Sequence, residues 1–414
     1  MAGRTRSRAC ATIPDPGAAA LERAGPHEAS EEAPLIRGGW EHRLSWPFAA
    51  LGVFAAVVAL LANPADARSA AAQDWSPFVL VAGLLLIGLV ANDDGLFSWA
   101  GRWLARSARD GLVLFLGAAV IVGVVTALLN LDTAVAFLTP VLVYTAWSRG
   151  EDEAPLLYGC LLLANAGSLL LPGSNLTNLI VLGHLHLRGG EFLAHMWPAW
   201  VASLVVTAAV VAFFERRSLQ ARVQQLAVPE RPVLGLGLPA VALAAVLVAA
   251  LKSPAVPVVV VGVVAIGIRL VRGEREPAGV IEVLGIPVLV GLFGVAVGLG
   301  TLGRAWSGPA TLLAHLDTGA TAAVAAGASV LVNNLPAASL LAARRPGHPF
   351  ALLVGLNVGP NLFVTGSLAW ILWLRAGRSA GARPSIAKAS TLGAVTVPLS
   401  MAAALSALVL TGAR

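Results

Sequence analysis

Long apolar stretches separated by short polar segments run along most of the chain after residue 45. A helix needs about 20 mostly apolar residues to cross a bilayer, and nine of these stretches approach or exceed that length. They are residues 46–62, 78–92, 155–182, 198–214, 234–251, 254–271, 281–303, 350–372 and 389–411. The pattern predicts an all-α polytopic membrane protein.

Two further apolar segments, 111–148 and 318–343, carry polar residues at their midpoints. Each is predicted to be a re-entrant hairpin, which enters and leaves the membrane on the same side. Backbone that is not helical is tolerated at membrane depth only where it is buried in protein or lines a cavity. The polar tips of the hairpins are therefore expected at an internal site.

Two of the predicted crossings, 155–182 and 350–372, are interrupted by helix-breaking residues and polar side chains. In the first, Pro172 and Gly173 interrupt the helix, and the polar residues of the break are Ser174, Asn175, Thr177 and Asn178. The second break carries Asn361, Thr365, Gly366 and Ser367. Both segments are predicted to be broken transmembrane helices.

The hairpins and the broken helices belong to an internal repeat. The sequence ALLNLDTAVAFL over 127–138 is similar to VLVNNLPAASLL over 330–341, so that Asn130 corresponds to Asn333. The first hairpin is expected to enter from inside and the second from outside, as in the inverted-topology repeats of secondary transporters. We expect a disordered cytoplasmic tail over 1–45, a first half over 46–214, a cytoplasmic linker over 215–233 and a second half over 234–414.

Charge supports this layout. The chain is 57% hydrophobic and 12% charged with a net charge of +6, whereas soluble domains contain roughly 25% charged residues. With nine crossings the N-terminus is inside and the C-terminus outside, and 21 of the 28 lysines and arginines then fall on inside segments. This agrees with the positive-inside rule. The basic balance therefore reflects loop placement and predicts no nucleic-acid partner.

The hairpin tips and the two breaks are expected to meet near the middle of the membrane and form a solute site. Free N–H groups at half-helix N-termini suit anions or oxygen-rich solutes, and unwound carbonyls suit cations. The first half-site is predicted to contain Asn130, Asp132, Thr133, Ser174, Asn175, Thr177 and Asn178. The second is predicted to contain Asn333, Asn334, Asn361, Thr365, Gly366 and Ser367. The same side chains could instead cap half-helices or join neighbouring helices, and both interpretations stay open.

Asp132 is the one carboxylate inside either predicted hairpin. A buried carboxylate is costly unless it is paired, solvated or protonated. Asp132 is therefore a candidate proton carrier, and the alternative is a helix N-cap that faces a water-filled cavity.

Several classes of function lack their signatures in this sequence. Neither Lys252 nor Lys388 follows a glycine, so there is no Walker A motif. The histidines and cysteines have no metal-site spacing, and no pair of catalytic residues occurs within a predicted crossing. We expect no enzyme activity, no cofactor and no metal.

Five segments occur in an order that resembles the arsenite/antimonite efflux permeases: NDDGLFSWAG, NLDTAVAFLTPVLV, SLLLPGSNLTNLI, SVLVNNLPAASLL and NVGPNLFVTGSLAWILWL. The resemblance covers about residues 46–411. That family belongs to the ion transporter superfamily, together with divalent-anion/sodium symporters and sodium/proton antiporters.

The resemblance implies a scaffold domain and a mobile transport domain, which holds both hairpins and both broken helices and moves as an elevator. It also implies a homodimer, exchange of metalloid for protons and, in some members, a separate ATPase. Asn130 stands where the symporters have a sodium-binding serine, and Pro336 stands where they have a threonine. These departures count against sodium coupling.

The chemistry of arsenic limits how such a solute could bind. Trivalent arsenic favours thiolates, yet Cys160 is the one cysteine in the predicted membrane region. Arsenite is therefore expected to bind as the neutral trihydroxide, through hydrogen bonds from amides and hydroxyls. We expect an inner-membrane exporter of arsenite or antimonite driven by proton entry. The alternatives are a sodium- or proton-coupled carrier of small carboxylates or other anions, and a sodium/proton antiporter.

Overall fold

The computed structural model describes residues 41–183, 185, 187–220 and 235–412, with side chains from residue 45 onwards. Within these ranges the chain is helical and contains no strand. Seven of the described helices are long and apolar enough to cross a membrane, which confirms the prediction of an all-α polytopic membrane protein. The predicted tail and most of the predicted linker lie outside the described residues.

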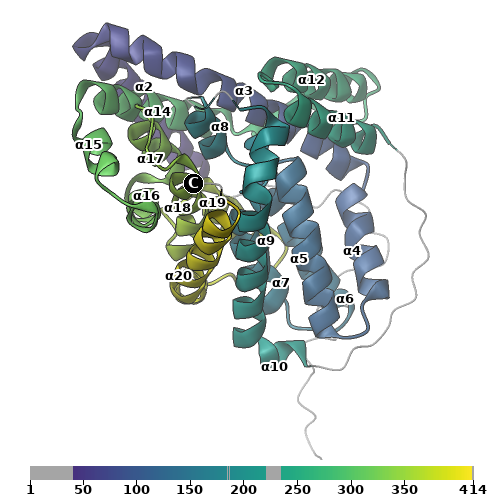
Figure 1. The fold of residues 1–414 in the computed structure, drawn as a ribbon. Coiled ribbons are helices and arrows are strands. Elements are labelled where there is room, and N and C mark those ends of the chain that lie inside the picture. The colour runs from purple at the N-terminus through teal and green to yellow at the C-terminus, as the bar shows by residue number, and fades with distance from the viewer. Residues whose placement is uncertain (1–40, 184, 186, 221–234, 413–414) are drawn as a thin grey trace, which may run out of the picture. The chain divides into compact units, whose positions relative to one another are not determined.

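The elements up to residue 220 include both arms of the first predicted hairpin and the first broken helix (Figure 1). They are α2 (Glu41–Ala62), α3 (Pro64–Asp93), α4 (Leu96–Ser107), α5 (Gly111–Leu128), α6 (Leu131–Ser148), α7 (Ala154–Gly167), η2 (Pro172–Ser174), α8 (Leu176–Leu182), α9 (Gly189–Phe214) and α10 (Arg216–Leu219).

The elements after residue 235 include the second hairpin and the second broken helix. They are α11 (Gly237–Ala250), α12 (Ala255–Val271), α13 (Pro277–Leu284), α14 (Ile286–Ala305), α15 (Gly308–Ala314), α16 (Thr318–Val332), α17 (Asn334–Leu341), α18 (Pro349–Val358), η3 (Gly359–Leu362), α19 (Leu368–Ser379) and α20 (Ile386–Leu410).

The order hairpin, broken helix and long helix occurs twice in the described chain. It runs through α5–α9 and again through α16–α20. The long helices that end the two series, α9 and α20, pack against each other, and Figure 1 shows α5 to α7 on one side of α9 and α15 to α18 on the other. The inverted orientation of the two series and an elevator movement stay predictions. Each arm of the first hairpin is 18 residues long, which is enough for a crossing by length and composition.

Helix α3 is twice as long as the sequence pattern indicates. The predicted crossing over 78–92 forms only its C-terminal half, because the helix starts at Pro64, where the side chain of Asn63 accepts a hydrogen bond from the Asp66 N–H. The sequence pattern leaves residues 63–77 as a connection between two predicted crossings, because they include polar side chains. In the structure two of these, Gln73 and Asp74, bind to other helices and so extend the buried helix.

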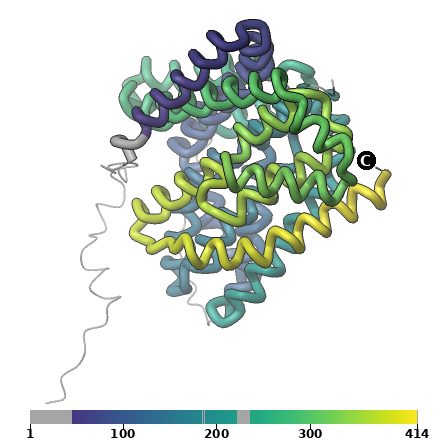
Figure 2. Tube along the Cα trace, turned by 90° about the vertical axis from the view of Figure 1, so that its left-hand side faces the viewer, coloured from purple at the N-terminus to yellow at the C-terminus, as the bar shows by residue number. Residues whose placement is uncertain are grey.

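Glycines allow two pairs of helices, α2 with α14 and α3 with α12, to approach each other closely. Helix α2 lies beside α14, as the tube in Figure 2 also shows. A Cβ atom on Gly294 of α14 would lie only 2.0 Å from the carbonyl oxygen of Gly52 in α2. In the same way a Cβ atom on Gly83 of α3 would lie 2.6 Å from the Cα of Val259 in α12. These contacts join backbone to backbone and leave no room for a side chain.

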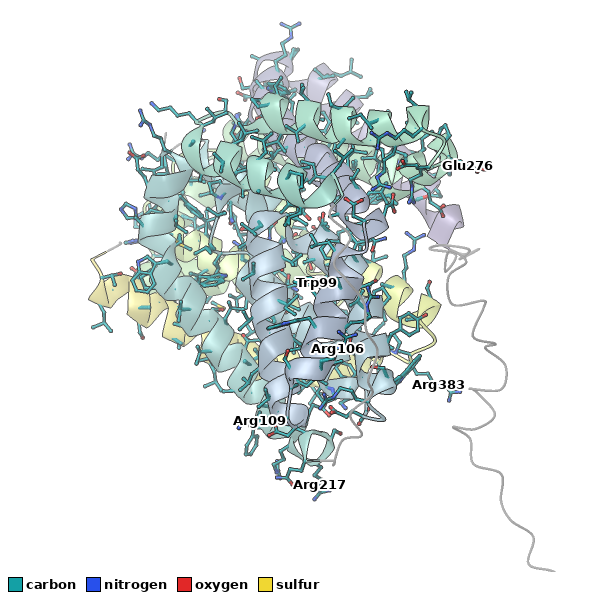
Figure 3. The ribbon with its side chains drawn as sticks, turned by 90° about the vertical axis from the view of Figure 1, so that its right-hand side faces the viewer. Trp99, Arg106, Arg109, Arg217, Glu276 and Arg383 are labelled. Carbon is teal, nitrogen blue, oxygen red and sulfur yellow. The ribbon has the colours of Figure 1, made fainter. Side chains whose placement is uncertain are left out.

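Helix α4 has one apolar face that packs against the first hairpin and one polar face. Phe97 and Leu104 are buried, and the Phe97 ring stacks on Phe137 of α6 with 5.6 Å between centroids. Figure 3 shows Trp99 and Arg106 of this helix above Arg109 and Arg217, which lie together at the lower end of the view.

Candidate functional site

The first hairpin turns at Asn130, which caps α6. Its Oδ1 accepts a hydrogen bond of 2.6 Å from the Thr133 backbone N–H. The Nδ2 of Asn130 and the Oγ1 of Thr133 are both buried and have no hydrogen-bond partner among the described residues. We call Asn130, Asp132 and Thr133 the first tip.

The first tip lies at the level where helix α7 ends. Helices α6 and α7 are joined by a short turn and run antiparallel, and Thr139 Oγ1 is 3.5 Å from Cys160 Sγ. Asp132 lies seven residues before Thr139 and Gly167 seven residues after Cys160, about 10 Å along each helix at 1.5 Å per residue. On its other side the first tip packs against α3, because the Thr133 methyl group occupies the space beside Gly88.

The side chain of Asp132 is partly exposed in the first turn of α6. Its carboxylate makes no hydrogen bond or ion pair with the residues that the structure describes. No lysine or arginine occurs in the sequence of either tip or either break. Asp132 is therefore a carboxylate without a partner at a polar, otherwise uncharged position.

The side chains of the first break largely satisfy the backbone of that break. Ser174 Oγ donates hydrogen bonds to the carbonyls of Ser168 and Leu171, at 2.5 and 2.6 Å. Asn178 Nδ2 donates to the same two carbonyls, at 2.8 and 3.1 Å. Asn175 caps α8 through the Thr177 N–H. Ser174 and Asn178 thus act as caps for the open end of α7, and their polar atoms are occupied.

Asn357, at the end of α18, joins the two broken helices. Its Oδ1 accepts hydrogen bonds from Ser168 Oγ, Asn175 Nδ2 and Thr177 Oγ1, at 2.9, 2.5 and 3.1 Å. Its Nδ2 donates to Asn178 Oδ1 at 2.8 Å. All five side chains are buried. We call this group the Asn357 network.

Two further contacts link the breaks. Ser367 Oγ lies 3.4 Å from Asn165 Oδ1, and Asn361 Nδ2 donates to the Leu162 carbonyl at 3.0 Å. The Oδ1 of Asn361 is buried without a partner among the described residues. Indole N–H groups satisfy a carbonyl at each break, from Trp200 to Gly167 and from Trp370 to Pro360.

Sequence analysis missed Asn357, Asn165 and Ser168 as members of the site. Asn165 begins the sequence NAGSLLLPGS over 165–174 and Asn357 begins NVGPNLFVTGS over 357–367, and each asparagine stands two residues before a glycine, Gly167 and Gly359. Each glycine packs against the first arm of a hairpin. Gly167 lies beside Thr126 of α5, and Gly359 lies beside Ser329 of α16. That shared N-x-G spacing is the signal that could have found the pair.

The second hairpin turns at Asn333 and is closed by the second break. Asn333 has φ 75°, and its Oδ1 accepts from the Leu335 N–H. The Asn334 N–H donates to the Gly366 carbonyl at 2.8 Å, and Asn333 Nδ2 donates to the Thr365 carbonyl at 3.3 Å. The structure thus brings Asn333, Asn334, Thr365 and Gly366 together through hydrogen bonds to the backbone carbonyls of the second break. No hydrogen bond of this kind ties the first tip to the first break among the described residues.

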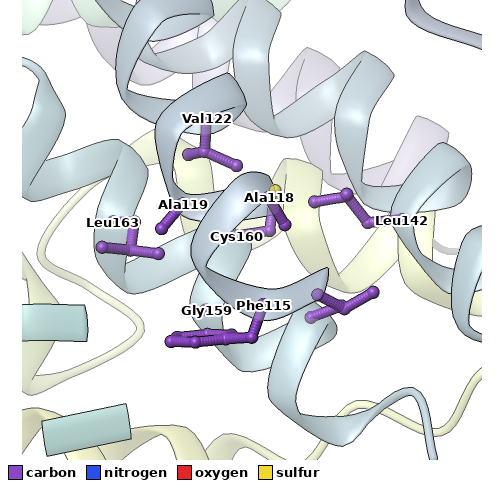
Figure 4. Close-up of a pocket in the computed structure, with 9 residues that line it drawn as sticks. Phe115, Ala118, Ala119, Val122, Leu142, Gly159, Cys160 and Leu163 are labelled. Atoms are coloured by element: carbon purple, nitrogen blue, oxygen red, sulfur yellow. The ribbon is translucent and has the colours of Figure 1, made fainter. Parts of the chain in front are cut away.

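A separate pocket lies inside the group formed by α5, α6 and α7 (Figure 4). Its lining is apolar apart from one thiol: Phe115, Ala118, Ala119, Val122, Leu142, Leu156, Gly159, Cys160 and Leu163. Such a lining offers no hydrogen bonds to an oxygen-rich solute. The first tip, with its two unpaired buried atoms and its free carboxylate, is the better candidate for a solute site.

Comparison with known proteins identifies related transporters. A family model described as a citrate transporter (CitMHS) matches residues 39–372. The arsenical pump membrane protein of Escherichia coli strain K12 is 25% identical over 362 residues, which cover 79% of this chain and 84% of that protein. The arsenical pump membrane protein of Yersinia enterocolitica is 25% identical over 347 residues, or 72% and 78% of the two chains.

A solved structure shares the fold. The YdaH transporter of Alcanivorax borkumensis, described as having an unusual topology, matches with a TM-score of 0.51 at 17% sequence identity. The match covers 85% of this chain and 89% of that one.

Proposed function

The chain belongs to the citrate transporter (CitMHS) family of membrane transporters, and we propose that within this family it exports arsenite or antimonite in exchange for protons. The protein is a multi-pass membrane transporter of the arsenical-pump type. The substrate and the coupling ion are the proposed part. Two relatives named arsenical pump membrane protein support this choice of substrate. The sequence match to each of them covers more than two thirds of this chain.

The observation that carries the proposal is the pair of unpaired polar atoms at the first tip. A buried donor or acceptor without a partner costs about 1–3 kcal/mol, so Asn130 Nδ2 and Thr133 Oγ1 gain free energy when a solute supplies the missing hydrogen bonds. A neutral trihydroxide carries three hydroxyl groups that both donate and accept. It also requires no positive side chain, which agrees with the lack of lysine and arginine in the tips and breaks.

Asp132 is proposed as the proton carrier. It stands between the residues of the two unpaired atoms in sequence, and no cation among the described residues pairs with it. A proton on Asp132 and the solute would therefore compete for one small polar site. Such competition is the simplest physical basis for exchange, since the carrier then crosses loaded with one or the other.

The remaining features of the proposal follow the resemblance. The transporter would lie in the inner membrane with its N-terminus inside, as a homodimer, and its hairpins and broken helices would move together as an elevator. The Asn357 network supports joint movement, because it ties α7–α8 to α18 by four buried hydrogen bonds. Some members of the family that the sequence resembles work with a separate ATPase subunit, and proton exchange does not require one.

The second candidate is a proton- or sodium-coupled carrier of citrate or a similar carboxylate. The description of the matching family favours it. A tricarboxylate has three negative charges, and protein sites that bind carboxylates usually pair them with arginine or lysine. The composition of the tips and breaks favours the neutral solute.

The test is solute uptake into everted membrane vesicles with an acidic lumen. We expect the wild type to accumulate arsenite in proportion to the proton gradient. Asp132→Asn should still exchange labelled for unlabelled arsenite but should lose accumulation driven by the gradient. Thr133→Val should weaken arsenite binding without removing the proton response.

The matched control is Glu282→Gln, which removes a carboxylate from an exposed position on α13 and should leave uptake unchanged. Accumulation of citrate in place of arsenite would decide for the second candidate. Full gradient-driven accumulation by Asp132→Asn would contradict the role of that carboxylate.

A further inference from the structure

A carboxylate that is more deeply buried than Asp132 lies far from the first tip, on α3. Asp74 is 1% exposed. Its Oδ2 accepts a hydrogen bond of 3.1 Å from Ser339 Oγ, which belongs to arm α17 of the second hairpin. Its Oδ1 is buried and has no partner among the described residues.

The residue beside it, Gln73, binds the C-terminal ends of two elements. Its Nε2 donates to the Ile180 carbonyl near the end of α8 at 3.0 Å, and to the Ala342 carbonyl just after α17 at 3.3 Å. Its Oε1 accepts from Arg304 of α14. We call Gln73, Asp74, Arg304 and Ser339 the α3 joint.

The charged groups around Asp74 leave its carboxylate unpaired. Among the described residues Arg304 is the one cation that acts on it, and this guanidinium is bound to Gln73 and, at 2.9 Å, to the Gly300 carbonyl. The carboxylate of Asp66 also acts on the Arg304 guanidinium, and Arg344 donates a hydrogen bond to the Arg304 backbone carbonyl. The sequences of α8 and α17, and of α2 from residue 45, contain no charged residue.

An ionised carboxylate in this position would have one donor for its two oxygens. Burying a charge without a cation or further donors is strongly unfavourable, whereas a carboxylic acid needs only modest hydrogen bonding. The observed contact between Asp74 and Ser339 therefore fits the protonated acid. Loss of the proton to water would leave an ion that must recruit Arg304 or admit water.

We propose that Asp74 is a proton-binding site, and that its proton holds the second hairpin arm against α3. Recruitment of Arg304 would take the guanidinium from Gln73, the residue that holds Ala342 and Ile180. Entry of water would separate Asp74 from Ser339. Either change loosens α17 at the α3 joint, so the charge of Asp74 sets whether this arm is held or released.

The use of this site in transport rests on the proposed function, but the binding of the proton does not. A measurement without solute therefore separates the two. Spin labels at Arg68→Cys and Arg345→Cys, both exposed positions on α3 and after α17, report the separation of the two elements. Cys10→Ser and Cys160→Ala remove the native thiols, and the distance is measured in liposomes from about pH 5 to about pH 9.

We expect a short distance at low pH and a longer one at high pH in the otherwise wild-type protein. Asp74→Asn should keep the short distance at every pH, and Asp74→Ser serves as a second neutral variant. Asp66→Asn, a loss of one carboxylate on the same helix, should titrate like the wild type. Asp132→Asn should do so as well, since its group belongs to the proposed exchange site.

The Asp132→Asn protein also allows a direct measurement that needs no change at Asp74. Its infrared spectrum should lose the carbonyl band of one protonated carboxylic acid over the pH interval in which the distance changes. A distance that does not respond to pH overturns the proposal. So does a response that persists in the Asp74 variants, or one that occurs without loss of the band.

Discussion

At the scale of single residues, asparagines organise the interior of this transporter. Asn130 and Asn333 cap the second arms of the hairpins, and Asn357 uses its oxygen for three donors and its nitrogen for Asn178. An amide offers both donors and acceptors without a charge. It can therefore satisfy broken backbone inside a membrane at a lower cost than an ionised group.

Asn357→Leu should destabilise the protein markedly. The substitution leaves the Thr177 hydroxyl and the Asn178 Oδ1 without a partner among the described residues, at about 1–3 kcal/mol for each group. Ser168 keeps its bond to the Asn165 carbonyl, and Asn175 keeps only a contact of 3.4 Å to Ser168. Part of the cost is regained when the groups find other partners in the membrane, so we expect the free energy of unfolding to fall by about 2 kcal/mol. Unfolding by denaturant in mixed micelles measures it.

Thr391→Ala is the control for this prediction. Thr391 is exposed, and the one partner of its hydroxyl among the described residues is a carbonyl of its own helix. Its loss should leave the unfolding midpoint close to that of the wild type. Equal midpoints for Asn357→Leu and the wild type would mean that the network adds little to stability.

At the scale of elements, close contact between helices depends on glycines that the hydropathy pattern treats as neutral. Gly52, Gly291 and Gly294 let α2 and α14 touch through their backbones. In a membrane, where lipid is as apolar as leucine, such close packing is a main source of helix association. The position of α2 on the molecule therefore rests on these small residues.

Gly294→Leu should displace α2 or unfold the pair. A Cβ atom there would lie 2.0 Å from the Gly52 oxygen, and since that atom belongs to the backbone it cannot rotate away. Overpacking of this kind costs about 1–3 kcal/mol or more. Thermal unfolding of the detergent-solubilised protein should show a lower midpoint.

Gly267→Ala provides the comparison, because Gly267 also lies inside a helix but a Cβ atom there meets nothing within 4 Å. Alanine is favoured over glycine in a helix by about 1 kcal/mol, so this variant should be at least as stable as the wild type. Similar losses in both variants would show that helix propensity and not packing sets the response.

At the scale of the whole described chain, charged residues gather at ends of helices and tie them together. Asp93 and Asp94 at the end of α3 pair with Arg275 and Arg269, which belong to or follow α12. The Asp94 carboxylate also accepts from the Gly237 N–H at the start of α11. Arg149 and Glu151 form a further ion pair, which is buried. The Arg149 guanidinium also donates hydrogen bonds to the carbonyls of Ala105 and Ala108 at the C-terminal end of α4.

The proposed orientation predicts which of the exposed positions face the cytoplasm. Arg109 and Arg217 lie at one end of the molecule in Figure 3, and both are exposed, as is Lys252. Single cysteines at Arg109 and Arg217 should react with an impermeant reagent in everted vesicles and not in intact cells. A cysteine at Lys252 should behave in the opposite way. Reaction of Arg109→Cys and Arg217→Cys from opposite sides would contradict the predicted layout.

Much of the architecture could be predicted from local patterns. Apolar length determined that the chain spans a membrane, and the similarity of 127–138 to 330–341 located two hairpin tips, where the structure indeed turns at Asn130 and Asn333. Pro172 and the polar residues after it located a real interruption between α7 and α8. These features are local, because helix formation and breaking depend on residues within a few positions of one another.

Only the tertiary structure decided which polar groups are occupied and which are free. Ser174 and Asn178 satisfy broken backbone, whereas Asn130 and Thr133 keep unpaired atoms. Asn357 and Asp74 find their partners about 180 and 265 residues away in the chain, and Asp74 lies in a stretch that reads as a loop. Composition along the chain reports the average polarity of a segment. It cannot report a hydrogen bond whose second partner is brought in by a distant helix, and the chemistry of this transporter depends on such bonds.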